Sequence, residues 1–462
     1  MKDTINRKLI ILLSVITSLF LIIALYLIYF ELTKANFYNA HSFNQRNYVD
    51  ENTYKRGSIY DTNGKLLTES VKTEDGNKRI NTYNFIFSPI IGYSNNRFGK
   101  TGIESSMNSQ LLNIIRNQDI FDKIENIAKD SQHGSDVYLT IDSNLQEYIY
   151  DQMGDKKGAV IVSDPKTGKI ISMVSKPTFN LNALEENWDD YMNSDDAIMI
   201  NRATQGRYEP GSIFKVISSL AFLDNNIDLN YYDKGSATIA DYTVNNFSGI
   251  AYGEIDLRKA LEVSSNAYFF EKSKEISNES FISTLNDFGF NKDYDLGLIR
   301  KNSLVPFKSG LSDLEKGNAA YGQGETYVVP IDMLNVINAI ANNGEVYQPY
   351  LVDKIVKDSE SRITEPKVLV DKINSKNADT LRDYLASAAN YNGIGDNYGI
   401  SIAGKTGTAE NDTDFAHSWY IGMSPAEDPK YTIVVILENT GGVAIDYAAP
   451  LAEKIFYYLN NE

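Results

Sequence analysis

Residues 158–175 read GAVIVSDPKTGKIISMVS, and this stretch carries the strongest fold signal in the chain. Two runs rich in β-branched residues flank the segment Asp164–Gly168, in which the proline comes early and the glycine late. That order is typical of a tight turn between two antiparallel strands. The stretch therefore predicts a β-hairpin.

The sequence on the C-terminal side of this hairpin predicts a long helical block followed by more strands. Helical patterns punctuated by glycines dominate from 212 to about 345, and a last helix is expected from about 446 to 459. Strand-like runs occupy 401–410, 417–424 and 430–439. Two strands, a helical block and three strands predict an α+β fold, with one antiparallel sheet built from both ends of the domain and flanked by helices.

The sequence on the N-terminal side predicts a smaller, β-rich unit. In RGSIYDTNGKLLTES, 56–70, the turn signal Asp61–Gly64 separates two short strand-like runs. A further strand is expected at 136–142, with a helix beginning at Ser143. We place the domain boundary at 136/137.

Composition narrows the possible functions of the 462 residues. The chain has no cysteine, which excludes disulfides, cysteine nucleophiles and Cys-ligated metals. Its three histidines, His41, His133 and His417, are far apart in sequence, so no metal site is expected. The net charge of −17 argues against a nucleic acid partner, because phosphate binding needs clustered Lys and Arg.

The N-terminus predicts a membrane anchor. Residues 9–30 contain no charge, and at ~1.5 Å per residue a helix of this length spans a bilayer core of ~30 Å. Lys2, Arg7 and Lys8 precede the run, so the positive-inside rule puts residues 1–8 in the cytoplasm and the rest outside. A cleaved signal peptide is the alternative, but the run is long and lacks a small-x-small cleavage site.

The first candidate for catalysis is Ser212 with Lys215, in RYEPGSIFK. Pro210 and Gly211 end the preceding segment, and Ser212 opens an apolar helix, so Ser212 and Lys215 share one helical face. A serine nucleophile needs a base within reach, and a lysine can serve only if burial or a second cation lowers its pKa. The same spacing at Ser163 and Lys166 falls in the predicted hairpin turn, where the helical geometry is impossible.

Two further candidates are weak when taken alone. Ser264 and Asn266, in EVSSNAYFFEK, lie in an apolar setting where a turn between helices would bury them. Lys405, Thr406, Gly407 and Thr408 follow a β-like run, which puts both threonine hydroxyls on one strand face beside a cation. A glycine weakens a strand unless another group must approach it closely, and this arrangement suits a substrate carboxylate.

Together the three motifs are specific. Ser-x-x-Lys, Ser-x-Asn and Lys-Thr-Gly form the set of penicillin-binding proteins and serine β-lactamases, and here they occur in that order. The chain resembles a class B penicillin-binding protein of the short subtype, a monofunctional peptidoglycan D,D-transpeptidase. The segments that carry the resemblance are RGSIYDTNGKLL, FGKTGIE (98–104), GAVIVSDPKTGKIISMVS, NRATQGRYEPGSIFKV, YGQGETYVVP (321–330), AGKTGTAE and HSWYIGMSP (417–425).

The resemblance implies four parts of the chain: a cytoplasmic tail, 1–8, a transmembrane helix, 9–30, a membrane-proximal pedestal domain, 31–136, and a transpeptidase domain, 137–462. It also implies the binding of D-Ala-D-Ala stem peptides and β-lactams, and a polytopic SEDS-family glycan polymerase as partner. No cofactor is expected.

The resemblance also implies the roles of the candidate residues. Ser212 would attack the D-Ala–D-Ala carbonyl, and Lys215 would take its proton. Ser264 would relay a proton to the leaving group, while Asn266 would hold the substrate amide and Lys215. Lys405 would lower the basicity of Lys215 and attract the terminal carboxylate, which the hydroxyls of Thr406 and Thr408 would bind. The backbone N–H groups of Ser212 and Thr408 would form the oxyanion hole.

Three alternatives stay open at the level of sequence. A Ser–His–Asp hydrolase would need His417 as its base, but His417 lies in a strand motif and is expected to be structural. A D,D-carboxypeptidase or β-lactamase could use the same residues. A scaffold for the glycan polymerase, or a β-lactam sensor, would need no turnover, although eight cytoplasmic residues leave little room for a sensor's output.

Overall fold

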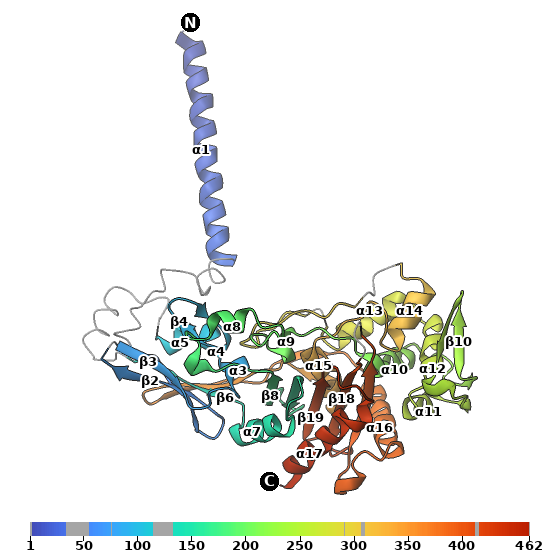
Figure 1. Cartoon of the computed structure of the whole chain (residues 1–462). Coiled ribbons are helices and arrows are strands. Elements are labelled where there is room, and N and C mark those ends of the chain that lie inside the picture. The colour runs from blue at the N-terminus through green and yellow to red at the C-terminus, as the bar shows by residue number, and fades with distance from the viewer. Residues whose placement is uncertain are drawn as a thin grey trace.

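The computed structural model describes residues 2–33, 55–74, 76–113, 133–290, 292–305, 310–411 and 415–461. Figure 1 shows a long N-terminal helix and a body in which a small β-rich region adjoins a larger region of mixed helices and strands. The α+β fold class is confirmed.

The N-terminal helix α1 (Lys2–Thr33) contains the predicted apolar run. In the part of the chain that the structure describes, its segment Ile11–Phe30 is the one helix long and apolar enough to cross a membrane. The large apolar side chains from Ile11 to Tyr29 are exposed. The helix therefore fits a single-pass membrane anchor.

The central sheet of the larger region has five antiparallel strands in the order β17-β18-β19-β7-β8. The predicted hairpin of residues 158–175 forms β7 and β8, and the three C-terminal runs form the other strands. The sheet built from both ends of the domain is thus confirmed. The strands are β7 (Gly158–Ser163), β8 (Ile170–Lys176), β17 (Ala403–Ala409), β18 (His417–Ser424) and β19 (Tyr431–Leu437).

Helices cover both faces of this sheet. In β7, Ala159 and Ile161 join one apolar cluster, whereas Val160 and Val162 join the other. The alternation follows from the two-residue period of a strand, and it explains why β7 is apolar without interruption. The second cluster packs against α7 (Ser143–Gln152) and α17 (Ala448–Asn461), and the first against α15 (Pro330–Ala341) and the helical block.

The helical block departs from the prediction at residues 231–255, and the described residues 292–305 contain no helix either. Residues 231–255 form two small antiparallel pairs, β10 with β11 and β9 with β12, instead of helix. Each strand has only three or four residues, too few for a period to emerge from the sequence. They are β9 (Tyr231–Asp233), β10 (Ser236–Ile239), β11 (Tyr242–Asn245) and β12 (Gly253–Ile255).

The remaining elements of this region are short, apart from α16. Its other helices are α8 (Trp188–Met192), α9 (Arg202–Gln205), α10 (Lys215–Asp224), α11 (Leu257–Glu262), α12 (Asn266–Lys272), α13 (Asn278–Asp287), α14 (Asp313–Ala320) and α16 (Ser375–Tyr391). A further antiparallel pair joins β13 (Glu345–Tyr347) to β16 (Val368–Asp371).

The pedestal region has a six-stranded sheet in the order β15-β14-β6-β1-β2-β3. The predicted Asp61–Gly64 turn connects β1 to β2, and the Gly64 N–H donates to the Asp61 carbonyl. The strands are β1 (Ile59–Tyr60), β2 (Leu66–Thr73), β3 (Gly76–Asn81), β6 (Asp136–Leu139), β14 (Val352–Lys357) and β15 (Glu360–Ile363). Beside this sheet lie α3 (Ser88–Ile91), β4 (Ser94–Asn95), β5 (Gly99–Lys100), α4 (Gly102–Ser106) and α5 (Asn108–Leu111).

Two strands of the pedestal sheet come from the C-terminal half of the chain. β14 pairs with β6, so residues 352–363 lie beside a sheet that otherwise uses residues before 140. The predicted boundary at 136/137 falls within β6. The two regions are therefore joined by a shared hydrogen-bonded sheet as well as by the backbone that runs from one region into the other.

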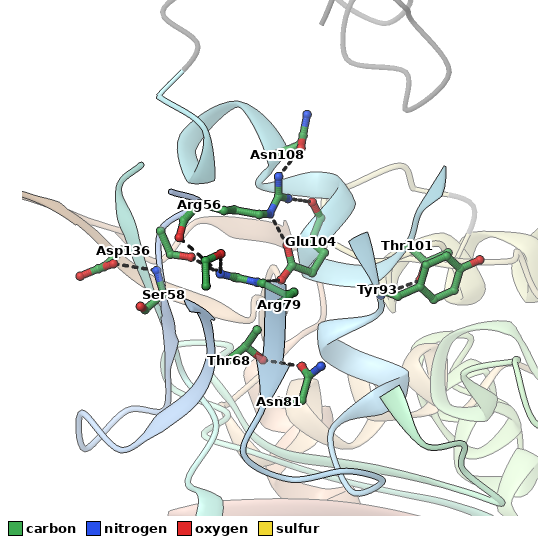
Figure 2. Close-up of polar contacts among 12 residues, drawn as sticks. Arg56, Ser58, Thr68, Arg79, Asn81, Tyr93, Thr101, Glu104, Asn108 and Asp136 are labelled. Carbon is green, nitrogen blue, oxygen red and sulfur yellow. Dashed lines mark hydrogen bonds and ion pairs between the residues drawn. The ribbon is translucent and has the colours of Figure 1, made fainter. Parts of the chain in front are cut away.

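A buried carboxylate holds the pedestal elements together (Figure 2). Glu104, on α4, is fully buried and receives Arg56 Nε at 2.5 Å and Arg79 Nε at 2.6 Å. Arg79 Nη1 also donates to the Gly57 carbonyl at 2.7 Å, and Arg56 Nη1 to Asn108 Oδ1 at 2.6 Å. Burial opposes ionisation of Glu104, but the two guanidinium groups outweigh it and hold its pKa below the ordinary value.

We expect Glu104→Ala to destabilise the folded pedestal by about 3–5 kcal/mol, because it leaves one buried and one partly buried guanidinium group without their carboxylate. Asp428→Ala, which breaks an exposed pair with Lys166, is the control and should leave the midpoint nearly unchanged. Thermal unfolding of the full chain in detergent measures both. Because the folded pKa of Glu104 is depressed, its contribution is present above pH 4.5 and is lost as the pH falls through the folded pKa. Equal midpoints for the two variants would contradict this role.

Candidate active site

Ser212 and Lys215 meet at the start of a helix. Ser212 lies in a 3-10 turn (Gly211–Phe214), and α10 begins at Lys215. Residues three apart eclipse one another in a 3-10 turn, which brings Lys215 Nζ to 3.0 Å from Ser212 Oγ. Lys215 is fully buried, whereas Ser212 is partly exposed, so of the two residues only Ser212 is open to solvent.

The Ser264–Asn266 segment is the predicted turn between two helices, α11 and α12. Ser264 has φ of 55°, a left-handed backbone that non-glycine residues adopt at a cost of roughly 1–3 kcal/mol. Its carbonyl oxygen lies 2.8 Å from Lys215 Nζ, and Asn266 Oδ1 lies 2.7 Å from the same nitrogen. The strained turn thus presents two acceptors to one amine.

Lys405 reaches the same turn from strand β17. Its Nζ donates to Ser264 Oγ at 3.0 Å and to the Thr406 carbonyl at 3.1 Å. Thr406 and Thr408 alternate with buried residues along β17 and are partly exposed on one strand face. The Thr408 hydroxyl oxygen accepts from the Ala444 N–H at 3.0 Å, which fixes its position.

Gly407 allows this strand to lie against the serine turn. A Cβ at Gly407 would come within 3.0 Å of Ile213 Cγ2 and of the Pro210 carbonyl oxygen. The expectation that this glycine permits a close approach is confirmed: the group that approaches is the turn carrying Ser212.

Burial and the like charge of Lys405 both favour the neutral form of the Lys215 amine. Burial, and secondarily the charge of Lys405, lower the pKa of Lys215 well below its ordinary value. Burial lowers the pKa of Lys405 to about 8. The pKa of Lys215 is lowered the more strongly, so its neutral form is the more accessible of the two.

The acceptors around Lys215 determine where its lone pair points. A neutral amine has two N–H donors and one lone pair. The Ser264 carbonyl and Asn266 Oδ1 can only accept, so they take the two N–H groups. Two hydroxyls remain that can donate to the lone pair, and Ser212 Oγ at 3.0 Å is nearer than Ser264 Oγ at 3.2 Å. The arrangement can therefore remove the serine proton.

A backbone contact that the sequence analysis missed supports the serine turn. The Gly211 N–H donates to the Gly322 carbonyl at 3.0 Å, and a Cβ at Gly322 would lie 1.9 Å from the Gly211 oxygen. Gly322 has φ of 88°. The two glycines of Gly322-Gln-Gly324 follow a helical pattern and could have indicated a tight turn. They could not have indicated that Gly211 is the residue in contact with Gly322.

His417 and the second copies of the motifs lie outside this arrangement. His417 Nδ1 accepts from the Asn439 N–H at 3.2 Å, its ring meets Tyr208 edge-on, and burial lowers its pKa. Among the described residues, no hydrogen bond joins His417 to Ser212. Ser163 ends the buried strand β7, while Lys166 pairs with Asp428 at the surface, as the hairpin turn requires. No cluster of three or more metal-binding side chains occurs in the described ranges.

Comparison with known families accounts for most of the chain. The model of the penicillin binding protein transpeptidase domain matches residues 158–458, and that of the penicillin binding protein A dimerisation domain matches residues 56–137. This chain belongs to the penicillin-binding protein transpeptidase family. The resemblance to class B penicillin-binding proteins is thereby confirmed.

Curated relatives align with most of this chain. The chain is 28% identical over 430 residues to peptidoglycan D,D-transpeptidase PbpA of Mycolicibacterium smegmatis, covering 86% of this chain and 87% of the relative. It is 28% identical over 371 residues to peptidoglycan D,D-transpeptidase MrdA of Haemophilus influenzae, covering 71% of this chain and 56% of the relative.

Solved structures agree over the described body. A ceftriaxone acyl-enzyme complex of penicillin-binding protein A from M. tuberculosis has a TM-score of 0.82 and 25% identity, covering 88% of this chain and 98% of that one. The D,D-transpeptidase domain of a peptidoglycan glycosyltransferase from Eggerthella lenta has a TM-score of 0.78 and 32% identity, covering 88% and 99%.

We expect Gly322→Ala to disrupt the serine turn, and Gly324→Ala to serve as its matched control. Both positions have positive φ, 88° and 77°, so each alanine carries backbone strain of about 1–3 kcal/mol. Only the Gly322 Cβ meets backbone, whereas the Gly324 Cβ has 3.4 Å to the Asn318 side chain. Thermal unfolding should show an additional loss of about 1–3 kcal/mol for Gly322→Ala. Matching losses in the two variants would contradict the close approach.

Proposed function

We propose that this protein is a serine-type peptidoglycan D,D-transpeptidase that cross-links stem peptides through an acyl-enzyme on Ser212. The observation that carries the proposal is the Ser212 hydroxyl 3.0 Å from a buried lysine amine whose pKa is strongly lowered. The names of the relatives, D,D-transpeptidases in both cases, supply the substrate class.

In the first half-reaction, Ser212 Oγ attacks the carbonyl carbon of the D-Ala–D-Ala peptide bond. Lys215 Nζ takes the hydroxyl proton as the new C–O bond forms. The C–N bond then breaks, and the leaving D-Ala amine receives a proton by way of Ser264 Oγ, which lies 3.2 Å from Lys215 Nζ. The products are a Ser212 ester and free D-Ala.

In the second half-reaction, an amine of a neighbouring stem peptide attacks the ester carbonyl. Lys215, again neutral, accepts a proton from the attacking amine, and the Ser212 oxygen recovers a proton as the ester bond breaks. A new amide cross-link forms. No redox or metal step is needed for either half-reaction.

The substrate would be held from the β17 side. The Lys405 ammonium attracts the terminal carboxylate, and the half-buried hydroxyls of Thr406 and Thr408 are placed to bind it. Asn266 would contact the substrate amide. The backbone N–H groups of Ser212 and Thr408 are the oxyanion donors, and removing one such donor typically costs ~10²–10³ in rate.

The decisive experiment is intact-protein mass spectrometry of the full chain in detergent after mixing with a penicillin. A strained β-lactam amide should acylate Ser212, leaving a stable adduct of one drug mass. Ser212→Ala should abolish the adduct. Ser163→Ala, in the other Ser-x-x-Lys sequence, is the matched control and should retain it. An adduct that survives Ser212→Ala would refute the assignment, and rapid hydrolysis of the drug without an adduct would indicate a β-lactamase instead.

The acylation rate should depend on pH with two limbs. It should rise as Lys215 loses its proton and fall near pH 8 as Lys405 loses its charge, because Lys215 has the lower pKa of the two. In Lys405→Arg the guanidinium stays charged, so the falling limb should disappear. Stopped-flow acylation by a fluorescent penicillin measures the profile. A falling limb that persists unchanged in Lys405→Arg would contradict the role of Lys405.

We further propose the topology and partner that the family resemblance implies. Residues 1–8 are cytoplasmic, 9–30 span the membrane, and the pedestal (31–136, completed by β14 and β15) and transpeptidase region (137–462) lie outside. Lys2, Arg7 and Lys8 support this orientation. A pedestal next to a membrane helix is suited to contact a polytopic SEDS-family glycan polymerase.

The absence of native cysteine makes the orientation testable with single cysteines. In intact cells, a membrane-impermeant maleimide should label Asp428→Cys, whose native side chain is 77% exposed, and should not label Asp3→Cys until the cells are lysed. The reverse pattern would overturn the topology.

A further inference from the structure

The middle residue of the Ser264–Asn266 turn is engaged by a buried acid that the reaction scheme does not use. Ser265 is fully buried, and its hydroxyl donates to Asp233 Oδ2 at 2.6 Å. The hydroxyl oxygen of Ser265 also accepts from the Tyr268 N–H at 3.0 Å, and so Ser265 caps the N-terminus of α12. The Ser265 side chain therefore makes its hydrogen bonds inside the protein and does not face the substrate.

Asp233 is the centre of a hydrogen-bonded network. It lies on β9, is fully buried, and accepts from the Gly235 N–H at 2.7 Å. Asn246 Nδ2 donates to both of its carboxylate oxygens at 2.9 Å. Among the described residues, no ion pair joins Asp233 to a cation. Burying a carboxylate without a cation costs free energy unless hydrogen bonds satisfy it. A neutral side chain at position 233 could not accept all of these hydrogen bonds in the same geometry.

Asn246 extends the network to the other side of the turn. It is 4% exposed, and its Oδ1 accepts from the Ala267 N–H at 3.0 Å. The preceding carbonyl, that of Asn245, accepts from Asn266 Nδ2 at 3.0 Å. Thus Asp233 and Asn246 hold the residues immediately before and after Asn266, and the adjoining backbone holds the Asn266 amide itself.

These contacts fix the two acceptors that orient the Lys215 amine. The Ser264 carbonyl belongs to the peptide unit that leads into Ser265, and Asn266 Oδ1 is one residue farther on. Ser264 is in a left-handed conformation, which persists only where the surroundings impose it. The Asp233–Ser265 bond is a restraint of that kind, next to the strained residue.

We propose that Asp233, acting with Asn246 through Ser265, is a positioning residue that aims the Ser264 carbonyl and Asn266 Oδ1 at Lys215. The inference rests on the proposed function, since it assigns a residue behind the acylation machinery. Asp233 touches neither substrate nor reacting atoms. It acts on the chemical step by keeping two N–H groups of the Lys215 amine engaged, so that the lone pair stays available to the Ser212 hydroxyl.

The test is acylation of the full chain in detergent by a fluorescent penicillin, with the non-covalent Kd and the acylation rate constant separated by varying the drug concentration. Asp233→Asn keeps the shape but offers one acceptor oxygen where donors from Gly235, Asn246 and Ser265 converge. The acylation rate constant should fall by up to about 100-fold, the cost of displacing a reacting group by about 1 Å, while Kd changes little. A merely structural role would not produce that split.

Asp332→Asn is the matched control for lost stability. Asp332 is a buried carboxylate that accepts from Ser303 Oγ at 2.5 Å and Arg300 Nη1 at 3.1 Å, in α15. Its substitution should lower the melting temperature but leave the acylation rate per folded molecule unchanged. An equal fall in rate in both variants would overturn the proposal, because the effect would then be one of stability.

Ser265→Ala provides a milder second variant and completes a double-mutant cycle. If Asp233 acts through Ser265, the double variant that combines Ser265→Ala with Asp233→Asn should lose less than the two single variants predict. Its fold decrease in acylation rate should be smaller than the product of the two single fold decreases. Wild-type rates in both single variants, or strictly multiplicative effects, would overturn the inference. Failure of the proposed function is distinct from these outcomes, because then the wild-type protein itself would form no Ser212 adduct.

Discussion

The burial of the Lys215 amine is the constraint on which the catalytic half of the structure depends. An amine without water must find acceptors in the protein, and here the acceptors are the Ser264 carbonyl and Asn266 Oδ1. Burial and the charge of Lys405 both favour its neutral form. Burial therefore makes the Lys215 amine available as a base, and its two fixed acceptors leave the lone pair for the neighbouring hydroxyls, of which Ser212 Oγ is the nearer.

The fold satisfies this constraint by joining segments that are distant in sequence. The central sheet brings β17, with Lys405, beside β18, while the helical block supplies the serine turn and the Ser264–Asn266 turn. Gly407 keeps the strand close to the serine turn because it has no side chain. The pedestal is tied to this assembly by β14 and β15, and internally by the bridge from Arg56 and Arg79 to Glu104. The smaller β-rich region is therefore joined by hydrogen-bonded strands to the region that holds the candidate active site.

Local patterns predicted the elements that have enough residues to show a period or a turn signal. The 158–175 hairpin, the C-terminal strands and the apolar N-terminal helix were all predictable in this way. The small strands of residues 231–255 were not, because three or four residues carry no period. The joining of β14 to β6 was also unpredictable, since strand pairing across more than 200 residues leaves no mark in either strand alone.

The sequence by itself determined the types of chemical group and their order: a serine and lysine three apart, a Ser-x-Asn turn, and a Lys-Thr-Gly strand. Only the tertiary structure decided that the three motifs meet at one place, although the sequence already excluded Ser163 with Lys166 because that copy falls in a hairpin turn. The tertiary structure also decided the pKa of Lys215, the contact of Gly211 with Gly322, and the anchoring of Ser265 by Asp233. The physical reason is that desolvation, like-charge proximity and hydrogen-bond geometry depend on distances in space, which residues far apart in the chain acquire only when the core forms.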